Sequence, residues 1–496
     1  MYLIALLALV VAFVAEAIEG GGVDVAGQKS CRNACHELSK RLGARLHYPY
    51  NDNYTFWDLK QQEAHPHCRA EPTSSGEVAF AVRVLVKERC RFAIKSGGHA
   101  RELDDSNSVG GVTLDLQRMR SVQVSPDRSR VRLGSGHNLL SAYRALDPLG
   151  LSFVGGRVDS VGLGGFTLGG GYSRLTPMYG LAMDNVFEYE IVLANASTVR
   201  VNERNHPDLY FALRGGGGNN FGVVTHFTVR AVEQGLVWGG TRVYEDKHTD
   251  SILSHLYNLT TGSKNETKAA YWGTHVFDGE TGRFSWAVSQ EYSSAIEYPS
   301  VFTELNKVPH ESSTLRLDNA GNFSIELARG SPWPRRNIFA TITHKPSIEM
   351  EHRIVQNWRN GIRSGCFPEG ISSNVVTQPL WEGAIRAMKK RGGNPVAIEA
   401  DGPLTVVLLI VTWKDDTDDE AAYSFARKWV ARAEADAFAL DVYHPYKYIN
   451  YVSKEQDPFA GYRKGSVERL RAIQRKVDPL GVFTSRGLCR GYFKLQ

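Results

Sequence analysis

The pattern of apolar and polar residues in the first half of the chain predicts helices and strands in alternation. The segment EVAFAVRVLVKER, residues 77–89, repeats its apolar residues at the spacing of one helical face. The run RFAIKS that follows is strand-sized and leads into a pair of glycines. Residues 110–134 predict short strands separated by turns, the clearest of them SPDRS. With the helical stretch NLLSAYRALDPLG and a strand pair around EYEIVLANASTVRV, this predicts an α+β domain at residues 64–235.

The pattern changes after Glu233. Strand-like runs such as YWGTHVF, FSWAVSQEY and NIFATITHK alternate with helical stretches such as IEMEHRIVQNWRNGI and DEAAYSFARKWVARAEA. This predicts a second domain at residues 236–445, an antiparallel sheet with helices on one face. The tail, residues 446–496, carries the motif YKYINYVSKEQDP and then a predicted helix, GSVERLRAIQRKVDP. Residues 18–63 form an N-terminal segment before the first domain.

The amino terminus indicates export. Residues 3–14 are nearly all apolar, and Ala15-Glu16-Ala17 has the small-x-small pattern of a signal-peptidase site. The apolar run is too short for a membrane span, so residues 1–17 are interpreted as a cleaved signal peptide. The strongest later apolar run, Val406 to Val411, has only the length of a strand. We therefore expect a secreted, extracellular protein that does not span a membrane.

Cysteines and glycosylation sequons agree with that compartment. The chain has six cysteines, an even number suited to disulfides, and the sequence does not choose among the 15 possible pairings. Zinc binding is disfavoured, because the pair Cys31 and Cys35 is not followed by a second such pair. Five N-x-S/T sequons predict a glycoprotein: Asn53, Asn195, Asn258, Asn265 and Asn322.

Charge and missing motifs exclude several functions. A formal charge of +5 on 496 residues, with no run of five basic residues, does not indicate a nucleic-acid partner. The chain lacks the G-x-x-x-x-G-K-[ST] phosphate loop, H-E-x-x-H and G-x-S-x-G, so ATP hydrolysis, zinc proteolysis and serine hydrolysis are unsupported. No metal site is predicted.

Glycine-rich segments carry the candidate chemistry. In KSGGHA, Lys95 to Ala100, two glycines follow the predicted strand and let backbone N–H groups converge on a phosphate. The alternative is a tight turn between strands. His99 beside it can lie near a cofactor ring, although a surface or hydrogen-bonded histidine is the commoner fate.

Two more glycine segments follow, interpreted as separate loops. The stretch 155–173 holds eight glycines in 19 residues, and RGGGGNNFGVVT covers residues 214–225. Such segments allow a backbone to approach something flat or anionic. Three of them close together favour one extended nucleotide. The G-x-G-x-x-G fingerprint in its strand-to-helix setting is missing, which argues against a Rossmann fold.

Five ordered motifs give a family resemblance. They are FAIKSGGHA, GGVTLDL, VGLGGFTLGGGYSRLTPMYGLAMDNV, PDLYFALRGGGGNNFGVVTHF and the tail YINYVSKEQDP…VDPLGVF. With them the chain resembles the vanillyl-alcohol oxidase, or PCMH-type, flavoproteins, in their berberine-bridge-enzyme-like branch with secreted fungal members. The resemblance implies a two-part FAD-binding domain, an antiparallel-sheet substrate domain, and a C-terminal segment that returns to the FAD domain.

The resemblance also implies roles for individual residues. His99 would be bonded to the flavin 8α carbon, and Tyr448 is the candidate catalytic base, with an aromatic wall as its alternative role. Val161 matches a position thought to gate oxygen, where a small residue favours oxidase behaviour. The remaining cofactor contacts would be Ser96, Gly97, Gly98, Ala100, Gly162, Gly165, Gly170, Gly222, Val224 and Asn450.

Two positions depart from the family pattern. Many members make a second flavin bond through a cysteine where this chain has Val158, so one tether is predicted. Many also have a histidine where this chain has Phe166. Tyr271, Trp272 and Trp286 could line a substrate cavity, but at strand spacing they are more often core, and no role is assigned to them.

Three functions stay open on this basis. The favoured one is a secreted FAD oxidase that takes a hydride from an alcohol or activated C–H of a phenolic or polyketide-like metabolite and passes electrons to O₂, giving hydrogen peroxide. The second is an oligosaccharide oxidase acting at the reducing-end carbon. The third is a secreted flavin- or sugar-binding glycoprotein without turnover. The expected partners are a small-molecule substrate and O₂.

Overall fold

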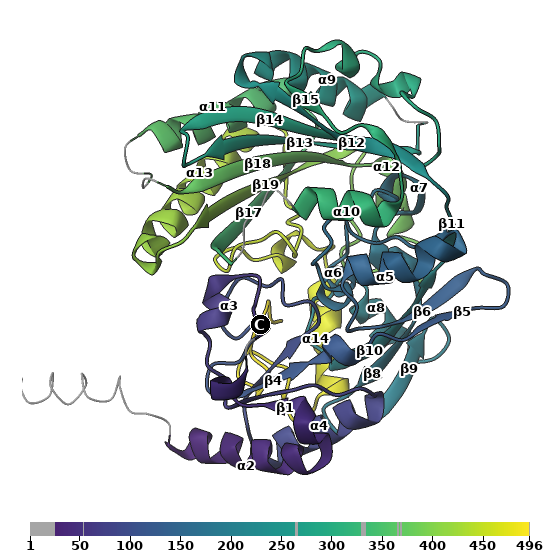
Figure 1. Cartoon of the computed structure of the whole chain (residues 1–496), viewed down its shortest axis with the longest axis vertical. Helices are drawn as coiled ribbons and strands as arrows, with labels where there is room; N and C mark the ends of the chain where they lie inside the picture. Colours follow the sequence, from purple (N-terminus) through teal and green to yellow (C-terminus); the bar gives the residue numbers. More distant parts are fainter. Residues whose placement is uncertain are drawn as a thin grey trace, which may run out of the picture.

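The computed structural model describes residues 25–52, 54–262, 266–328, 334–364, 367 and 370–495. The predicted signal peptide, Asn53, Asn265 and Cys366 lie outside the described residues. Figure 1 shows two halves stacked along the longest axis. We call residues 25–235 with 446–495 the glycine-loop half and residues 236–445 the large-sheet half.

The predicted helix and strand at the start of the glycine-loop half are confirmed. Helix α4 (Ser75–Glu88) begins where the Ser74 hydroxyl accepts from the Glu77 N–H, and it buries Val78, Val82 and Leu85. Strand β3 (Phe92–Lys95) pairs in parallel with β4 (Val112–Asp115). The sheet order is β1–β2–β4–β3, completed by β1 (Leu46–His47) and β2 (Cys68–Ala70).

A second, antiparallel sheet forms the remainder of this half. Its strand order is β5–β6–β10–β8–β9, which includes the predicted hairpin of β8 and β9. The strand bounds are Val122–Val124, Arg130–Gly134, Val223–Arg230, Val186–Val192 and Thr198–Asn202. Strand β7 (Leu151–Ser152) pairs separately with β11 (Val232–Glu233). The helices of this region are α3 (Leu59–Glu63), α5 (Leu139–Leu146), α6 (Leu163–Leu168), α7 (Thr176–Tyr179) and α8 (Pro207–Leu213).

One glycine segment is more regular than predicted. The stretch 155–173 is not loop throughout, because it contains α6. The Gly164 N–H donates to Ser96 Oγ at 3.1 Å, and a Cβ on Gly164 would lie 3.0 Å from the Ser96 Cβ. Close packing against the first glycine turn therefore stabilises a helix that local propensity disfavours.

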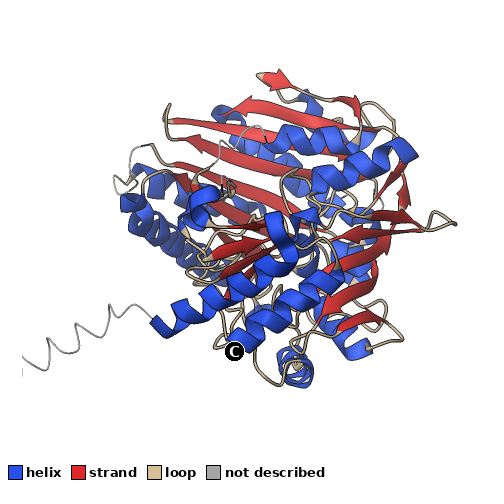
Figure 2. Ribbon diagram, turned by 60° about the horizontal axis from the view of Figure 1, so that its bottom comes forward, coloured by secondary structure: helices blue, strands red, loops and turns tan. Residues whose placement is uncertain are grey.

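The predicted antiparallel sheet dominates the other half. Among the described residues nine strands pair antiparallel in the order β15–β12–β14–β13–β18–β19–β17–β20, with β16 beside β12. Figure 2 shows its long strands fanned side by side. The bounds are Ser312–Ser313, Val237–Glu245, Arg283–Tyr292, Ala269–Asp278, Ser372–Leu380, Leu404–Trp413, Arg336–His344, Tyr443–His444 and Arg316–Asp318.

Helices cover one face of this large sheet, as predicted. Helix α9 (Thr249–Gly262) packs with α11 (Ile348–Arg363), and α11 packs with α13 (Asp419–Ala439). Apolar side chains of these helices and of the strands below them form two buried clusters. The short helices α10 (Ala320–Ala328) and α12 (Glu382–Ala387) contact the other half. The opposite face of the sheet is turned toward the glycine loops (Figure 1).

The C-terminal segment returns to the glycine-loop half, as the resemblance implied. Helix α14 (Ser466–Val477), yellow in Figure 1, lies among the blue elements of that half. The Gln474 side chain donates to the Asn220 carbonyl at 2.9 Å, and the Asn220 side chain donates to the Phe493 carbonyl at 3.0 Å. The tail is therefore bound to the third glycine segment.

Two disulfides occur among the described residues. Cys31–Cys90 and Cys35–Cys68 tie helix α2 (Val25–Leu42) to the end of α4 and to β2. Among the described cysteines, Cys489 is a free, buried thiol. No helix in the described part of the chain is long and apolar enough to cross a membrane. The same residues contain no cluster of side chains that could hold a metal ion.

Candidate functional site

A cavity of about 880 Å³ separates the glycine loops from the exposed face of the large sheet. This volume is within the range of small-molecule and cofactor sites. Of the predicted cofactor-binding and catalytic residues, Gly170 is the one that does not line the cavity. The predicted residues on the wall are Ser96, Gly97, Gly98, His99, Ala100, Val161, Gly162, Gly165, Gly222, Val224, Tyr448 and Asn450.

Glycine is required where the first two glycine segments touch. A Cβ on Gly97 would lie 2.3 Å from the Gly162 nitrogen, and a Cβ on Gly162 would lie 2.1 Å from the Gly97 nitrogen. Gly98 has φ of +73°, which a side chain rarely adopts. The two backbones therefore form one continuous surface beside His99.

Gly165 has a different function. A Cβ there meets no atom within 4 Å, and the residue is exposed on the cavity wall. Packing does not demand glycine at this position, and the backbone there leaves space for a flat group. This open backbone and the glycine nest at Gly97 and Gly98 fit a nucleotide cofactor with a flat ring and a pyrophosphate.

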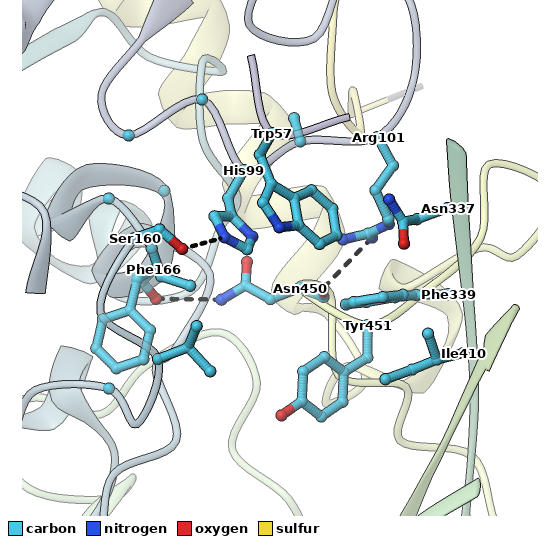
Figure 3. A pocket seen from close by; sticks show the side chains of 18 of the residues that line it. Trp57, His99, Arg101, Ser160, Phe166, Asn337, Phe339, Ile410, Asn450 and Tyr451 are labelled. Atoms are coloured by element: carbon cyan, nitrogen blue, oxygen red, sulfur yellow. Dashed lines mark hydrogen bonds between the residues drawn. The ribbon is translucent and has the colours of Figure 1, made fainter. Parts of the chain in front are cut away.

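His99 is held in one orientation. Its Nε2 lies 2.9 Å from Ser160 Oγ, and its ring stacks on Trp57 with centroids 4.1 Å apart and an interplanar angle of 20° (Figure 3). Burial, with a smaller effect of the nearby Arg101 charge, lowers the pKa of His99 to about 3. The imidazole is therefore neutral at physiological pH. Its Nδ1 has no hydrogen-bond partner among the described residues.

The tail motif delivers two tyrosines and an asparagine to the cavity. The Tyr448 hydroxyl oxygen accepts from Asn450 Nδ2 at 2.9 Å and from the N–H groups of Gly171 and Tyr172 at 3.0 and 3.3 Å. Burial raises the pKa of Tyr448. Gly170 lies behind this ring, since a Cβ there would be 3.2 Å from a Tyr448 ring carbon. Gly170 therefore supports Tyr448 and not the cavity surface.

Asn450 and Arg101 connect the tail to both glycine segments. Asn450 Nδ2 also donates to the Phe166 carbonyl at 3.1 Å, so the backbone of Phe166, and not its apolar ring, holds the motif. Arg101 Nη2 donates to the carbonyls of Val452 and Asn450 at 3.2 and 3.4 Å, and its guanidinium lies 4.2 Å from the Phe339 ring. Figure 3 shows these side chains grouped around His99.

The large sheet supplies the opposite wall through alternate residues of its central strands. On β13, Trp272 faces the cavity, whereas Tyr271 belongs to the core under the helices. Trp286 on β14 is also in that core. Of the three aromatics left without a role, one therefore lines the site. The other strand residues on this wall are Thr274, Val276, Ala287, Ser289, Asn337, Phe339, Asn374, Val376, Leu408, Ile410 and Thr412.

Several site residues escaped sequence reasoning. Arg157 donates from Nη2 to Gln378 Oε1 at 2.7 Å and to the Tyr451 hydroxyl at 2.9 Å. Its guanidinium lies 4.4 Å from the Trp272 ring. Arg157 lies within the glycine segment 155–173, where no sequence pattern distinguished it as a site residue. Trp57 comes from the N-terminal segment, for which no pattern predicted a contact with His99.

Both departures from the family pattern are on the wall as well. Val158 lines the cavity and offers no thiol. Phe166 lines it too, with its ring against Gly156 and Gly171, where Cβ atoms would lie 2.8 Å from ring carbons. The flavin contacts that a cysteine and a histidine make in many relatives are therefore not available here.

A nucleotide cradle facing an antiparallel sheet, with the tail returning between them, defines the class: an FAD-dependent oxidoreductase. A family model described as an FAD binding domain matches residues 66–202. The FAD-dependent monooxygenase FUP4 of Fusarium proliferatum is 32% identical over 92% of this chain and 94% of its own. The FAD-dependent monooxygenase tpcD of Cochliobolus heterostrophus is 31% identical over 92% and 93%.

Solved structures agree on the fold. 6-Hydroxy-D-nicotine oxidase from Arthrobacter nicotinovorans superposes with a TM-score of 0.74 at 22% identity, covering 91% of this chain and 97% of its own. Glucooligosaccharide oxidase from Acremonium strictum, which carries a 6-S-cysteinyl, 8α-N1-histidyl FAD, gives a TM-score of 0.72 at 19% identity over 90% and 97%. The chain belongs to the family of these fungal FAD-dependent oxidoreductases, and its fold is that of the vanillyl-alcohol oxidase, PCMH-type, flavoproteins.

Proposed function

We propose that the protein is a secreted oxidase with FAD covalently attached to His99 alone, acting on a small phenolic or polyketide-like metabolite. The observation that carries the proposal is a neutral, oriented imidazole at the end of the glycine cradle. In this assignment residues 64–235 and 446–496 hold FAD, and residues 236–445 form the substrate wall. FAD, when bound, supplies a two-electron acceptor for a hydride and a donor of electrons to O₂.

The tether is supported by the contact with Ser160, which fixes the position of the imidazole and leaves Nδ1 without a protein partner. The Nε2–H of His99 donates to Ser160 Oγ in the tautomer that leaves the Nδ1 lone pair free. A free lone pair is what bond formation to a flavin carbon requires. The histidyl N1 bond of the Acremonium strictum oxidase has the same regiochemistry. Val158 in place of a cysteine supports a single bond.

The remaining cradle residues are proposed to bind and orient the cofactor. Backbone N–H groups at Ser96, Gly97, Gly98 and Ala100 hold the pyrophosphate, and Gly165 lets the flat ring approach the backbone. Gly162, Gly222 and Val224 complete the surface, Asn450 holds the tail against it, and Gly170 acts through Tyr448. Val161 lies partly buried at the wall and is proposed to control oxygen access.

Tyr448 remains our proposal for the base that accepts the substrate proton. Three N–H donors around its oxygen favour the phenolate, which partly offsets burial. Tyr451 is the competing candidate, because its hydroxyl already accepts from the Arg157 cation. We expect Y448F to have a lower kcat and to lose the increase in kcat with pH that deprotonation of a general base produces. Y451F should be affected less. The reverse result assigns the base to Tyr451.

Secretion is supported by the disulfides and by the sequons. The three sequons that the structure describes, at Asn195, Asn258 and Asn322, are all exposed. Disulfides persist in oxidising compartments. Treatment of the protein secreted by a fungal host with endoglycosidase should lower its apparent mass, and a protein retained in the cytosol with no shift would contradict this part.

Sugar oxidation is the second candidate function. It is supported by polar side chains of the sheet wall, among them Ser289 and Asn374, which can bond hydroxyl groups. Peroxide release across a panel of phenolic alcohols and oligosaccharides separates the two oxidases. If the protein keeps its yellow colour but releases peroxide with none of these compounds, the result would favour a flavin- or sugar-binding glycoprotein without turnover.

The tether is tested by acid precipitation. The wild-type pellet should stay yellow, because a covalent flavin survives denaturation, whereas the H99A pellet should be colourless. A yellow pellet from H99A would show that the flavin is bonded to a residue other than His99. A colourless wild-type pellet would leave FAD non-covalent.

A further inference from the structure

We propose that Arg157 binds a carboxylate on the substrate, so that the enzyme prefers aromatic acids to their neutral analogues. This inference rests on the proposed function, since it concerns the substrate end of the same cavity. It specifies the chemical class of the ligand, which the family fold leaves open.

The contacts of Arg157 leave part of its guanidinium free. Nη2 is used twice, for Gln378 Oε1 and for the Tyr451 hydroxyl. Nε and Nη1 have no hydrogen-bond partner among the described residues, and neither is a fully buried atom. Arg157 itself lines the cavity, so its guanidinium is within reach of a ligand bound there. A planar guanidinium with free donors is suited to a carboxylate.

The charge of Arg157 is also uncompensated. No carboxylate among the described residues lies within ion-pair distance of it. Glu291 is near enough to feel its charge but is paired with Arg174 at 3.1 Å. A partly buried cation without a partner is costly, and an anionic ligand removes that cost.

Other charged groups also line the wall, among them Arg101, Asp105, Glu280, Arg335 and Lys414. Arg101 already donates to two backbone carbonyls of the tail. Glu280 lies in the turn after β13, and the end of that strand, Asp278, is six residues or about 20 Å from Trp272 at the rise of a strand. The acidic strand residue near Arg157 is Glu291 on β14, which Arg174 pairs with.

An apolar surface next to Arg157 fits the aromatic part of such a ligand. Trp272, Val376 and Leu408 form one cluster, against which Phe339, Ile410 and Tyr451 pack. Figure 3 shows Phe339, Ile410 and Tyr451 on the side of the cavity opposite Ser160. The guanidinium stacks on Trp272, so the cation and the apolar surface are continuous.

Equilibrium dialysis of the full-length, flavin-loaded protein against benzoate and benzamide tests the proposal. We expect the wild type to bind benzoate about tenfold or more tightly than benzamide, the effect of charged hydrogen bonds. R157M should bring the ratio to about one with benzamide binding unchanged. R144M, which removes an exposed arginine on α5, should keep the wild-type ratio.

Three results would overturn it. They are equal binding of the two probes by the wild type, no measurable benzoate binding, and an equal loss of both probes in R157M that keeps its flavin and its melting temperature. Dialysis needs no turnover and no flavin signal. A colourless or peroxide-silent protein that still prefers benzoate through Arg157 would therefore refute the oxidase proposal and leave this one standing.

Discussion

At the residue scale, the His99–Ser160 contact is the feature that makes the tether chemically reasonable. Ser160 is a positioning residue, since it acts on the imidazole and not on the reacting carbon. We expect S160A to lower the fraction of covalent flavin, because the imidazole then loses the hydrogen bond that orients it. S160T, which keeps a hydroxyl, should retain most of it. Flavin fluorescence of the denatured band on a gel, relative to total protein, measures this fraction.

The melting temperatures of the Ser160 variants separate an effect on the orientation of His99 from an effect on folding. Both variants should melt within a few degrees of the wild type, since one partly exposed hydroxyl is changed. Equal covalent flavin in S160A, S160T and the wild type would show that the hydrogen bond has no part in forming the tether.

Gly165 provides a second residue-scale prediction. We expect G165L to fold but to lose bound FAD, because the side chain enters open cavity space that the cofactor requires. G235L is the matched control, since Gly235 is exposed, also has nothing within 4 Å of its Cβ, and lies off the cavity wall. The ratio of flavin to protein, measured from the absorption spectrum, shows whether G165L has lost FAD that G235L keeps. G165L with full flavin content would refute the position assigned to the ring.

Single residues also show what the sequence could and could not reveal. Gly97, Gly98 and His99 were predictable, since glycine runs after a strand have few structural uses and the histidine adjoins one. Trp57 and Arg157 were not. Their contacts join segments far apart in the chain, and no local spacing encodes a stacking partner.

At the element scale, buried ion pairs fix the strands that lead into the first glycine turn. Arg69 on β2 bonds both Glu71 and Asp115, and Lys95 at the end of β3 donates to Asp115 at 3.0 Å. Burial alone would raise the pKa of Glu71, but hydrogen bonds from Arg118 and Arg69 outweigh it and lower the value to about 2.

This network predicts a specific acid sensitivity. Since the folded pKa of Glu71 lies below its ordinary value of 4.5, its charge stabilises the fold above pH 4.5, and that contribution disappears as the pH falls to about 2. E71Q should therefore be less stable than the wild type at pH 7, and the difference should shrink steadily below pH 4.5. Urea unfolding across this range measures it. A difference that is independent of pH would show that packing and not charge accounts for the loss.

Helices and strands were the most predictable level of the structure. Periodicity found α4, β3, α5, the β8–β9 hairpin and α14, because each buries one regular face. Helix α6 was missed, since its glycines argue against a helix and tertiary contacts, among them the one with Ser96, stabilise it. Strand periodicity also left the exposed face of β13 undecided, and thus the position of Trp272, until the covering helices were placed.

At the scale of the whole molecule, the cavity forms where three separate parts of the chain come together. One wall comes from the glycine loops, one from the large sheet, and the closing residues come from the tail. The family resemblance anticipated this arrangement, whereas the pattern of residues alone gave two domains and no cavity between them. The charge distribution within the cavity, on which the preference for acids depends, emerged only from the assembled structure.

The most direct test of the account is the mass of one peptide. Trypsin should release Ser96–Arg101, SGGHAR, from freshly isolated protein, because Lys95 and Arg101 flank it. The account predicts that this peptide carries the full mass of FAD on His99 and that no other peptide does. An unmodified SGGHAR as the main species, or the flavin on a different peptide, would contradict it.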